Sequence, residues 1–453
     1  MMLPRHLQLL LLGALLLPGL AVAVPPIQHW TLENGTRVYF IESDSLPIVD
    51  IRLTFDAASA RDGELPGLAR LTNALLDQGN AGLSADEIAR RLETVGARLS
   101  GGSERDMAWL QLRSLTEPKA LEQALDTLTR IVGAPEFPVD AFERQKARML
   151  VGLQAVKQSP DALGERAFYR ALYGDHPYAN PPAGTEESLA RISRRDVIDF
   201  YRRYYTTGNA VIALVGAIDR AQAEALAERL SAALPAGPAA PPLPPVAPLQ
   251  QARAEHIPFQ SAQTHIMVGQ PAIGRDSADI YAFTVGNHIL GGGGLVSLLT
   301  STMRDRHGLS YSTSSGFVPS ARPGPFIIST QVRTESTADA IEVLRDTFIS
   351  FLREGPTRQQ LDLAVRNITG GYPLSLDSNA DLLGYLSMIG YYGLPLDYLE
   401  TYPERIAAVT AEEVRQAFRR HLDPNRLVTV MVGPQPDPAT GAGATAAATA
   451  PAE

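Results

Sequence analysis

The same helix-and-strand pattern occurs twice in this sequence, about half a chain apart. In the first half, a helix pattern around Phe200 leads to the apolar run AVIALVG, which ends at Gly216. In the second half, a similar pattern around Phe418 leads to RLVTVMVG, which ends at Gly433. The spacing of the apolar residues predicts amphipathic helices, and the unbroken apolar runs predict buried strands. The sequence therefore predicts two copies of one domain, and 453 residues leave room for both.

Each half also opens with strands followed by a helix. In the first half, residues 30–42 predict a hairpin with Asn34 and Gly35 at its tight turn, and a strand follows at 48–55. In the second half, a strand is predicted at 263–269 and a helix at 280–290. Strands that precede helices in both copies predict an α+β fold, with each domain a sheet backed by helices.

An Ala- and Pro-rich tract separates the two halves. It reads LPAGPAAPPLPPVAPL, has neither a helical nor a strand period, and predicts an extended, semi-rigid linker. The end of the chain is of low complexity. The predicted organisation is a signal peptide at 1–23, a first domain at 24–233, a linker at 234–250, a second domain at 251–433 and a disordered tail at 434–453.

The N-terminus has the layout of a secretory signal peptide. A basic Arg5 precedes a leucine-rich run at 7–17, a Pro-Gly pair breaks this run, and small residues lead to a cleavage point after Ala23. The alternative is a membrane anchor, but the break shortens the apolar run below the roughly 20 residues that a span needs. We therefore expect export to the periplasm, a mature chain that begins at Val24 and no stable membrane insertion.

The composition argues against several classes of partner. The chain has 40 Lys and Arg residues against 49 Asp and Glu residues, and loss of Arg5 with the signal peptide leaves 39 against 49, a net charge of −10. This excess of acid argues against nucleic acid as a partner, and no polybasic tract indicates binding to anionic lipid. The absence of cysteine excludes a disulfide framework and a lipoprotein attachment site.

The segment GLARLTNALLDQG, residues 67–79, predicts a helix with one apolar face. Its leucines recur at helical spacing, so this face packs inward, and Gly79 closes the helix. The residues that can project from it into a cleft are Arg70, Asn73 and Ala74. None of them suits a metal site, because arginine stays protonated, asparagine is no base and alanine has no donor atom.

Four segments make the sequence similar to the inverted zinc peptidases (inverzincins), which include pitrilysin, insulin-degrading enzyme and the mitochondrial processing peptidase. The resemblance covers residues 27–433 and implies two homologous α+β domains arranged as a clamshell. The segments follow in the family's order: GLARLTNALLDQG at 67–79, HPYANPPAGTEESLARI at 176–192, LGGGGLVSLLTSTMRDRHGLSY at 290–311 and LSLDSNADLLGYLSMIGYYGLPLDYL at 374–399. The last segment resembles one that is typical of the short bacterial members.

In active members of this family, an H-x-x-E-H helix supplies two histidine ligands for zinc and a glutamate base for the metal-bound water. The resemblance places Arg70 at the first histidine, Asn73 at the glutamate and Ala74 at the second histidine. It places the third ligand, a glutamate, at Val151 or Gly152, and neither residue is a carboxylate. The resemblance thus implies that this chain binds no zinc and that zinc belongs to a partner subunit.

The second half keeps a different part of the family's active site. In the family, an R-x-x-x-G-L-x-Y pattern supplies an arginine and a tyrosine that contact the substrate backbone and polarise the scissile carbonyl. Here MRDRHGLSY maps them to Arg304 and Tyr311. A cation and a phenol can both donate to a developing oxyanion. The alternative is structural: a solvated arginine at a helix end and a half-buried strand tyrosine.

Two further segments are candidates for contact with a peptide. Gly291, Gly292, Gly293 and Gly294 permit close backbone approach, and a glycine-rich loop helps to recognise substrate in the non-catalytic subunit of the processing peptidase. The alternative is that these glycines only end a helix. Residues 99–112 (LSGGSERDMAWLQL) match the region whose sheet edge pairs with bound peptide in this family.

No other catalytic site has support in the sequence. The histidines of the mature chain show no zinc-helix spacing, and we expect a structural role for His288 and a turn at His176. A G-x-S-x-G elbow and a G-x-x-x-x-G-K-[ST] phosphate loop are both absent.

These observations favour one function and leave a second open. The first is the non-zinc subunit of a heteromeric zinc metallopeptidase, a heterodimer in which Arg304 and Tyr311 act on a peptide beside the zinc site of a homologous H-x-x-E-H partner. The second is a catalytically inactive pseudopeptidase with a structural or peptide-holding role.

Overall fold

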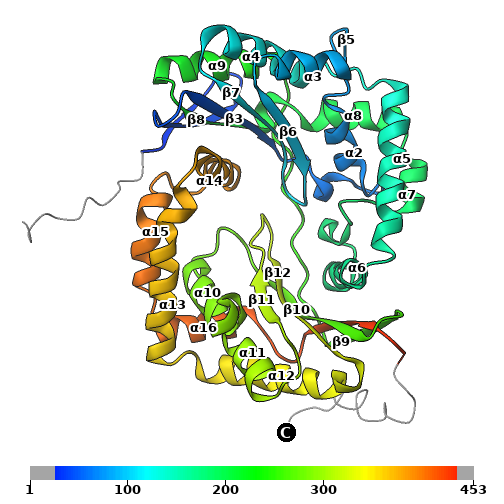
Figure 1. Ribbon diagram of the computed structural model, residues 1–453, viewed down its shortest axis with the longest axis vertical. Helices are drawn as coiled ribbons and strands as arrows, with labels where there is room; N and C mark the ends of the chain where they lie inside the picture. The colour runs from blue at the N-terminus through cyan, green and yellow to red at the C-terminus, as the bar shows by residue number, and fades with distance from the viewer. Residues whose placement is uncertain (1–25, 436–453) are drawn as a thin grey trace, which may run out of the picture.

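The computed structural model describes residues 26–435, which form two domains built around two sheets (Figure 1). The predicted signal peptide and residues 436–453 of the predicted tail lie outside the described residues. Within residues 26–435, no helix has the length and apolar content needed to cross a bilayer.

The first domain contains a six-stranded sheet in the order β1-β2-β8-β3-β7-β6. Strands β2 and β8 are parallel, and the pairs β8–β3, β3–β7 and β7–β6 are antiparallel. Its strands are β1 Gln28–Thr31, β2 Arg37–Glu42, β3 Ile48–Phe55, β6 Arg98–Ser103, β7 Ala108–Leu115 and β8 Ala210–Gly216, and a separate pair is formed by β4 Gly79–Asn80 and β5 Leu83–Ser84. Its helices are α2 Leu68–Leu75, α3 Ala85–Glu93, α4 Pro118–Gly133, α5 Val139–Val156, α6 Pro160–Tyr173, α7 Glu186–Arg191, α8 Arg194–Tyr204 and α9 Arg220–Ala233.

The second domain contains a five-stranded sheet in the order β11-β12-β10-β13-β9. Its strands are β9 Arg253–Pro258, β10 Gln263–Ile273, β11 Thr313–Phe317, β12 Gly324–Arg333 and β13 Val428–Gly433. Its helices are α10 Ile280–Asn287, α11 Leu298–Thr300, α12 Thr337–Glu354, α13 Arg358–Gly371, α14 Asn379–Tyr392, α15 Tyr398–Ala407 and α16 Ala411–His421. Two π-helices, η5 His288–Gly292 and η7 Ser301–Arg306, flank α11.

The two sheets repeat one topology. Strands β2, β8, β3, β7 and β6 correspond in order and pairing to β9, β13, β10, β12 and β11, and the parallel pair occupies the same place in each sheet. In each sheet, an inner strand, β8 or β13, follows an amphipathic helix, α8 or α16. The prediction of two homologous α+β domains is confirmed.

The helix predicted at 67–79 is shorter in the structure. It ends at Leu75, and Gly79 does not close it but starts β4. Gly79 is required for close approach, because a Cβ there would lie 2.6 Å from Cγ of Pro138. The helix predicted at 280–290 similarly ends at Asn287 and continues as the π-helix η5.

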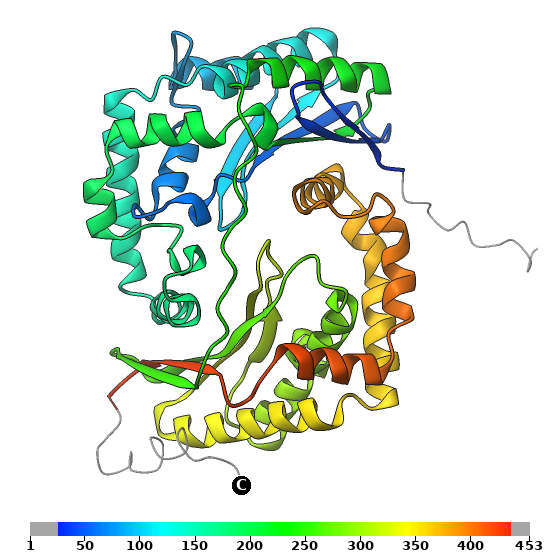
Figure 2. The same ribbon diagram turned by 180° about the vertical axis from the view of Figure 1, so that it is seen from behind.

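One helix of each half packs on the sheet of the other half (Figures 1 and 2). From the second half, α14 covers β8, β3 and β2, where Leu383, Leu386 and Ile389 pack with apolar residues of the first sheet. From the first half, α6 covers β13 and β10, where Phe168 packs with valines of the second sheet. Since each fully buried apolar side chain contributes about 1.5–3 kcal/mol, this exchange interlocks the two domains.

The linker also differs from a free spacer. It is extended, as predicted, but both halves bind it: the carbonyl of Pro235 accepts from the amide of Thr207 at 3.0 Å, and the carbonyl of Leu243 accepts from Nε of Arg322 at 2.8 Å. Leu243 and Leu249 are buried. The linker is therefore a strap across the two domains, because its proline carbonyls and leucines find fixed partners.

Candidate functional site

A cavity of about 770 Å³ lies beside α2 and the edge strand β6. The predicted cleft residues Arg70, Asn73 and Ala74 all line it. The remaining wall comes from both domains. It includes residues 99–110 except Ala108, and also Gln145, Arg148, Glu165, Tyr169, Tyr178, Val318, Ser320, Pro325 and Tyr392. The cavity is thus the place where the family's zinc chemistry would occur.

Asn73 has a structural role at the position of the family's glutamate base. Its side chain is mostly buried, and Nδ2 donates to the carbonyl of Trp109 at 3.2 Å and to the hydroxyl of Tyr205 at 3.3 Å. These bonds tie α2 to β7 and to the end of α8. An amide held in this way cannot take a proton from water.

The two positions that the resemblance gives for the third ligand lie on α5, outside the lining of the cavity. Val151 is 71% exposed, Gly152 is exposed as well, and neither lines the cavity. Gln145 of the same helix does line it and is 8% exposed. Arg148 also lines the cavity, so Gly152 lies four residues, about one helical turn, beyond the lining. Gln145 was not singled out from the sequence.

The residues present do not form a zinc site. Within residues 26–435, no group of three or more His, Asp and Glu side chains is arranged to hold a metal ion. The two cavity positions that match the family's histidine ligands hold Arg70 and Ala74, and α5 contributes Gln145 to the lining. A guanidinium, a methyl group and an amide are poor partners for Zn²⁺, which prefers imidazole, thiolate and carboxylate.

Asp62 fixes the start of α2 and was not identified from the sequence. Its two carboxyl oxygens accept from the amides of Gly67 and Ala69, each at 2.7 Å. Burial raises the pKa of Asp62 to about 8, although these two hydrogen bonds oppose the shift. The signal available in the sequence is an acid shortly before a helix, a common capping pattern.

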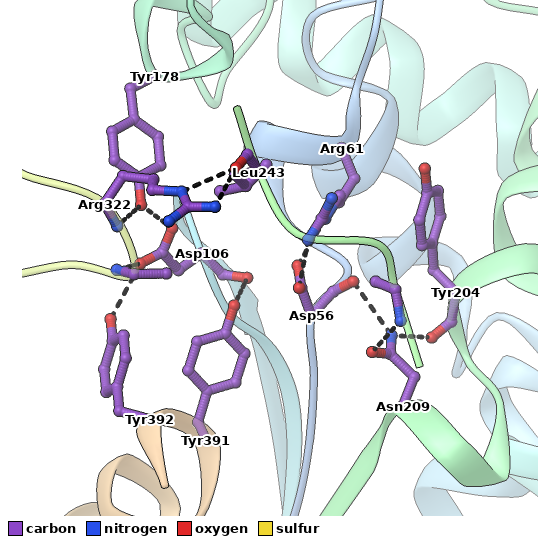
Figure 3. Close-up of polar contacts among 12 residues, drawn as sticks. Asp56, Arg61, Asp106, Tyr178, Tyr204, Asn209, Leu243, Arg322, Tyr391 and Tyr392 are labelled. Atoms are coloured by element: carbon purple, nitrogen blue, oxygen red, sulfur yellow. Dashed lines mark hydrogen bonds and ion pairs between the residues drawn. The ribbon is translucent and has the colours of Figure 1, made fainter. Parts of the chain in front are cut away.

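Asp106 joins the two domains at the wall of the cavity (Figure 3). Its carboxylate accepts from the hydroxyl of Tyr178 at 2.6 Å, the amide of Ala321 at 2.8 Å and the hydroxyl of Tyr392 at 3.1 Å. Its backbone carbonyl accepts from the hydroxyl of Tyr391 at 2.9 Å. Asp106 lies in the β6–β7 turn, whereas three of these donors belong to the second half, so the site's shape depends on both domains.

Figure 3 also shows a second cluster of polar residues, Asp56, Arg61 and Asn209, beside the contacts of Asp106. Asp56 pairs with Arg61, whose Nε donates to it at 2.7 Å, and burial raises the pKa of Asp56. Asn209 donates to the carbonyls of Asp56 and Tyr204 at 3.1 and 2.7 Å, and accepts from the amide of Ala240 in the linker at 3.1 Å. These contacts hold the strap against the first domain.

Arg304 and Tyr311 lie together, outside this cavity. The guanidinium carbon of Arg304 is 4.9 Å from the ring centroid of Tyr311, and Tyr311 is 83% exposed. Within residues 26–435, neither the guanidinium nor the phenol hydroxyl has a hydrogen-bond partner. Neither residue lines the cavity beside α2. The structure therefore brings the two predicted residues together on an open surface.

Buried residues and hydrogen bonds fix the segment that precedes Tyr311. Met303 of η7 is fully buried, and its carbonyl accepts from the amide of Leu309 at 2.8 Å. Ser310 is buried, and its hydroxyl contacts the carbonyls of Ser312 and Gln331 at 2.7 and 2.9 Å. This anchoring fixes the base of Tyr311 while its ring faces outward.

Close packing and a left-handed backbone account for the four glycines, which lie where a helix ends. A Cβ at Gly291 would lie 2.3 Å from the amide nitrogen of Ser315, and one at Gly293 would lie 2.7 Å from the carbonyl of His288. Gly294 has a φ of +63°, and a Cβ at Gly292 would meet Asn287 at 2.7 Å. These packing roles account for the run without a ligand. His176 caps a 3-10 turn, as expected. His288 beside the glycines is half buried, but its Nε2 is buried without a hydrogen-bond partner in the described chain, so a fully hydrogen-bonded structural role is not what the structure shows.

Strand β6 offers an unpaired edge within the described chain. It pairs only with β7, and its residues 99–103 line the cavity. Gly101 and Gly102 carry no side chain that would block approach to the strand. A peptide could add here as a further strand.

Family models and known proteins match most of the chain. Residues 37–186 match the family described as "Insulinase (Peptidase family M16)", and residues 191–368 match "Peptidase M16 inactive domain". A Helicobacter pylori protein named a non-peptidase homolog is 25% identical over 403 residues, covering 87% of this chain and 91% of that protein. A Mycobacterium bovis protein named as an uncharacterized zinc protease is 28% identical over 423 residues, covering 91% and 94%.

Solved structures give the same result. The crystal structure of a peptidase M16 inactive domain from Pseudomonas fluorescens has a TM-score of 0.87 and 40% identity, covering 90% of this chain and 98% of that chain. A protease structure from Helicobacter pylori has a TM-score of 0.84 at 17% identity, which shows the shared fold. Together with the replaced zinc-helix residues, these matches show that the chain belongs to the M16 (insulinase) peptidase family and is of its inactive type.

Proposed function

We propose that this chain is the non-zinc subunit of a heteromeric M16 peptidase and supplies Arg304 and Tyr311 to a partner's zinc site. The observation that carries the proposal is the contact between Arg304 and the exposed Tyr311, neither of which has a hydrogen-bond partner in the described chain, on a protein whose own α2 lacks the metal ligands. An arginine and a phenol with free donors are suited to bind a peptide carbonyl and to stabilise the oxyanion that forms from it.

Exposed apolar residues that precede the pair in the sequence support a docking role. Leu295 and Val296, in the segment between η5 and α11, are 70% and 62% exposed. Large apolar side chains that are this exposed gain most from being covered by another protein. A homologous subunit that carries H-x-x-E-H, with its zinc, is the partner that would use the pair, and a peptide is the substrate. We also propose that the complex is periplasmic, on the basis of the N-terminal sequence.

In this mechanism each chain performs a separate step. The partner's H-x-x-E-H helix would hold the zinc, which would supply Lewis-acid activation of a water molecule, and the glutamate of that helix would take the proton of this water. Arg304 holds the peptide backbone, while the hydroxyl of Tyr311 donates to the carbonyl oxygen as its negative charge grows. Removal of one such donor typically lowers turnover by about 10²–10³-fold.

The test is to co-purify variants of this chain with the H-x-x-E-H homologue and to measure complex formation, zinc content and peptide hydrolysis. Tyr311→Phe and Arg304→Ala should lower turnover by at least about 100-fold at unchanged zinc content. Arg306→Ala is the matched control, because Arg306 is an exposed arginine of the same π-helix at an unspecified position of the R-x-x-x-G-L-x-Y pattern. Unchanged hydrolysis in both test variants, with the complex intact, would favour the structural or peptide-holding role instead.

A further inference from the structure

The cavity beside α2 contains two arginines that the proposed function does not use. Arg70 on α2 and Arg148 on α5 both line it, and both are exposed to it. Within residues 26–435, neither guanidinium has a hydrogen-bond or ion-pair partner. By contrast, the third cavity arginine, Arg105, donates to the carbonyls of Tyr178 and Asn180 and lies 3.4 Å from the ring centroid of Tyr169.

The two free arginines belong to neighbouring helices. Helices α2 and α5 are in contact and run in opposite directions: Gly79 after α2 passes Pro138 before α5, and α7 links the other two ends. Because Arg70 and Arg148 line the same cavity from these two helices, one group bound in the cavity can be approached from both sides.

Four carboxylates also line the cavity: Asp77, Glu104, Asp106 and Glu165. The carboxylate of Asp106 already accepts three hydrogen bonds, and Asp77 accepts one from the side-chain amide, Nε2, of Gln78 at 2.7 Å. Glu104 lies near Tyr392, and Glu165 lies near Tyr169, at the wall formed with the second domain. No carboxylate of the described chain forms an ion pair with Arg70 or Arg148.

We propose that this cavity is a second peptide-binding site, in which Arg70 and Arg148 bind a carboxylate of a peptide that pairs with the edge of β6. The two guanidinium groups bring positive charge to the place where active relatives hold zinc. Planar donors of arginine fit a carboxylate better than any other common group of a peptide. The free edge of β6, with Gly101 and Gly102, provides backbone partners for the adjoining residues.

This site is separate from Arg304 and Tyr311, since those residues do not line the cavity. It binds peptide without cleaving it, because Asn73 is engaged and no metal site is present in the described chain. The carboxylate is either the C-terminus of the peptide or an Asp or Glu side chain. Both offer the same two oxygens to the arginine pair.

The test uses the isolated mature chain, without a partner, and fluorescence anisotropy. The probe is an N-terminally labelled heptapeptide of alternating Val and Thr with a free C-terminal carboxylate. It is compared with its C-terminal amide, with an amide that carries Glu at its last position, and with a free acid N-methylated at alternate residues. Because the partner is absent, the result does not depend on the peptidase proposal.

The free acid should bind about tenfold more tightly than the amide, the difference expected for charge-assisted hydrogen bonds in a cavity open to water. Arg70→Gln and Arg148→Gln should abolish this difference. Arg144→Gln is the matched control, because Arg144 lies on α5 one turn earlier, pairs with Asp140 and does not line the cavity. N-methylation should weaken binding in all variants, since it removes donors needed for strand pairing.

The amide with Glu distinguishes the two sources of the carboxylate. If Glu restores tight binding, side-chain carboxylates are recognised; if it does not, the C-terminus is. Equal binding of free acid and amide to the unmodified chain would overturn the proposal, as would absence of binding or an unchanged preference in both test variants. Unfolding midpoints of the variants show whether each one is folded.

Discussion

Replacement of Asp106 by alanine should destabilise both domains together. The variant loses three hydrogen bonds to the carboxylate and leaves the amide of Ala321 without its acceptor. Hydrogen bonds to a charged group contribute about 1.5–3 kcal/mol each, and the two tyrosine hydroxyls can recover part of this from water in the cavity. The expected loss is about 3–5 kcal/mol in the free energy of unfolding.

The assay is chemical and thermal unfolding of the purified chain, with hydrogen exchange measured by segment. For a single transition of a chain this long, the loss corresponds to a fall in Tm of about 3–5 °C. Exchange should quicken in two places that are distant in sequence, the β6–β7 turn and the segment around Ala321. Asp77→Ala is the control, because Asp77 lines the same cavity but accepts only from Gln78. Its effect should stay below about 1 kcal/mol.

Two results would refute this reasoning. A loss below about 1 kcal/mol for Asp106→Ala would mean that the three hydrogen bonds contribute little beyond what water supplies. Separate unfolding transitions for the two domains in the unmodified chain would mean that the exchange of α6 and α14 does not couple them. In either case Asp106 would be a local turn residue and not a junction between domains.

Two further predictions concern α2 and the N-terminus. Burial raises the pKa of Asp62 from its ordinary value of 3.8 to about 8, so the folded chain retains a proton that the unfolded chain releases. The free energy of unfolding should therefore fall as pH rises from about 4 to 8, and urea titrations should show a weaker fall for Asp62→Asn. Equal slopes for both proteins would contradict a raised pKa. Secreted protein from the native host should begin at Val24 by mass spectrometry, and an intact Met1 would refute cleavage after Ala23.

Much of the fold follows from patterns that are local in the sequence. Strand β3, predicted at 48–55, occupies Ile48–Phe55 in the structure, and the Asn34–Gly35 turn joins β1 to β2 with a φ of +89° at Gly35. These elements are predictable because periodicity and turn chemistry act over a few neighbouring residues. The predicted end of α2 was wrong, because a contact with a distant residue decides it. Gly79 matches a helix-closing signal, but its contact with Pro138 decides its conformation.

The candidate site shows the same division. The sequence alone determines that Arg70, Asn73 and Ala74 cannot hold zinc, because their side chains lack the necessary donors. It also determines the R-x-x-x-G-L-x-Y pattern. Only the tertiary structure decides that Gln145, not Val151 or Gly152, faces the cavity, and that Arg304 and Tyr311 lie in contact on an open surface.

The exchange of α6 and α14 between the sheets, and the junction at Asp106, were likewise beyond reach of the sequence. An amphipathic pattern specifies that a helix buries one face, but any apolar sheet of the right shape can receive it. The choice between two homologous sheets depends on how chain connections and packing place them in space. Similarly, the local sequence around Asp106 is that of an ordinary turn. Its role follows from three donors that belong to distant segments of the chain. Local chemistry thus determined which elements form and which reaction is lost, and long-range packing determined which surfaces remain available to bind.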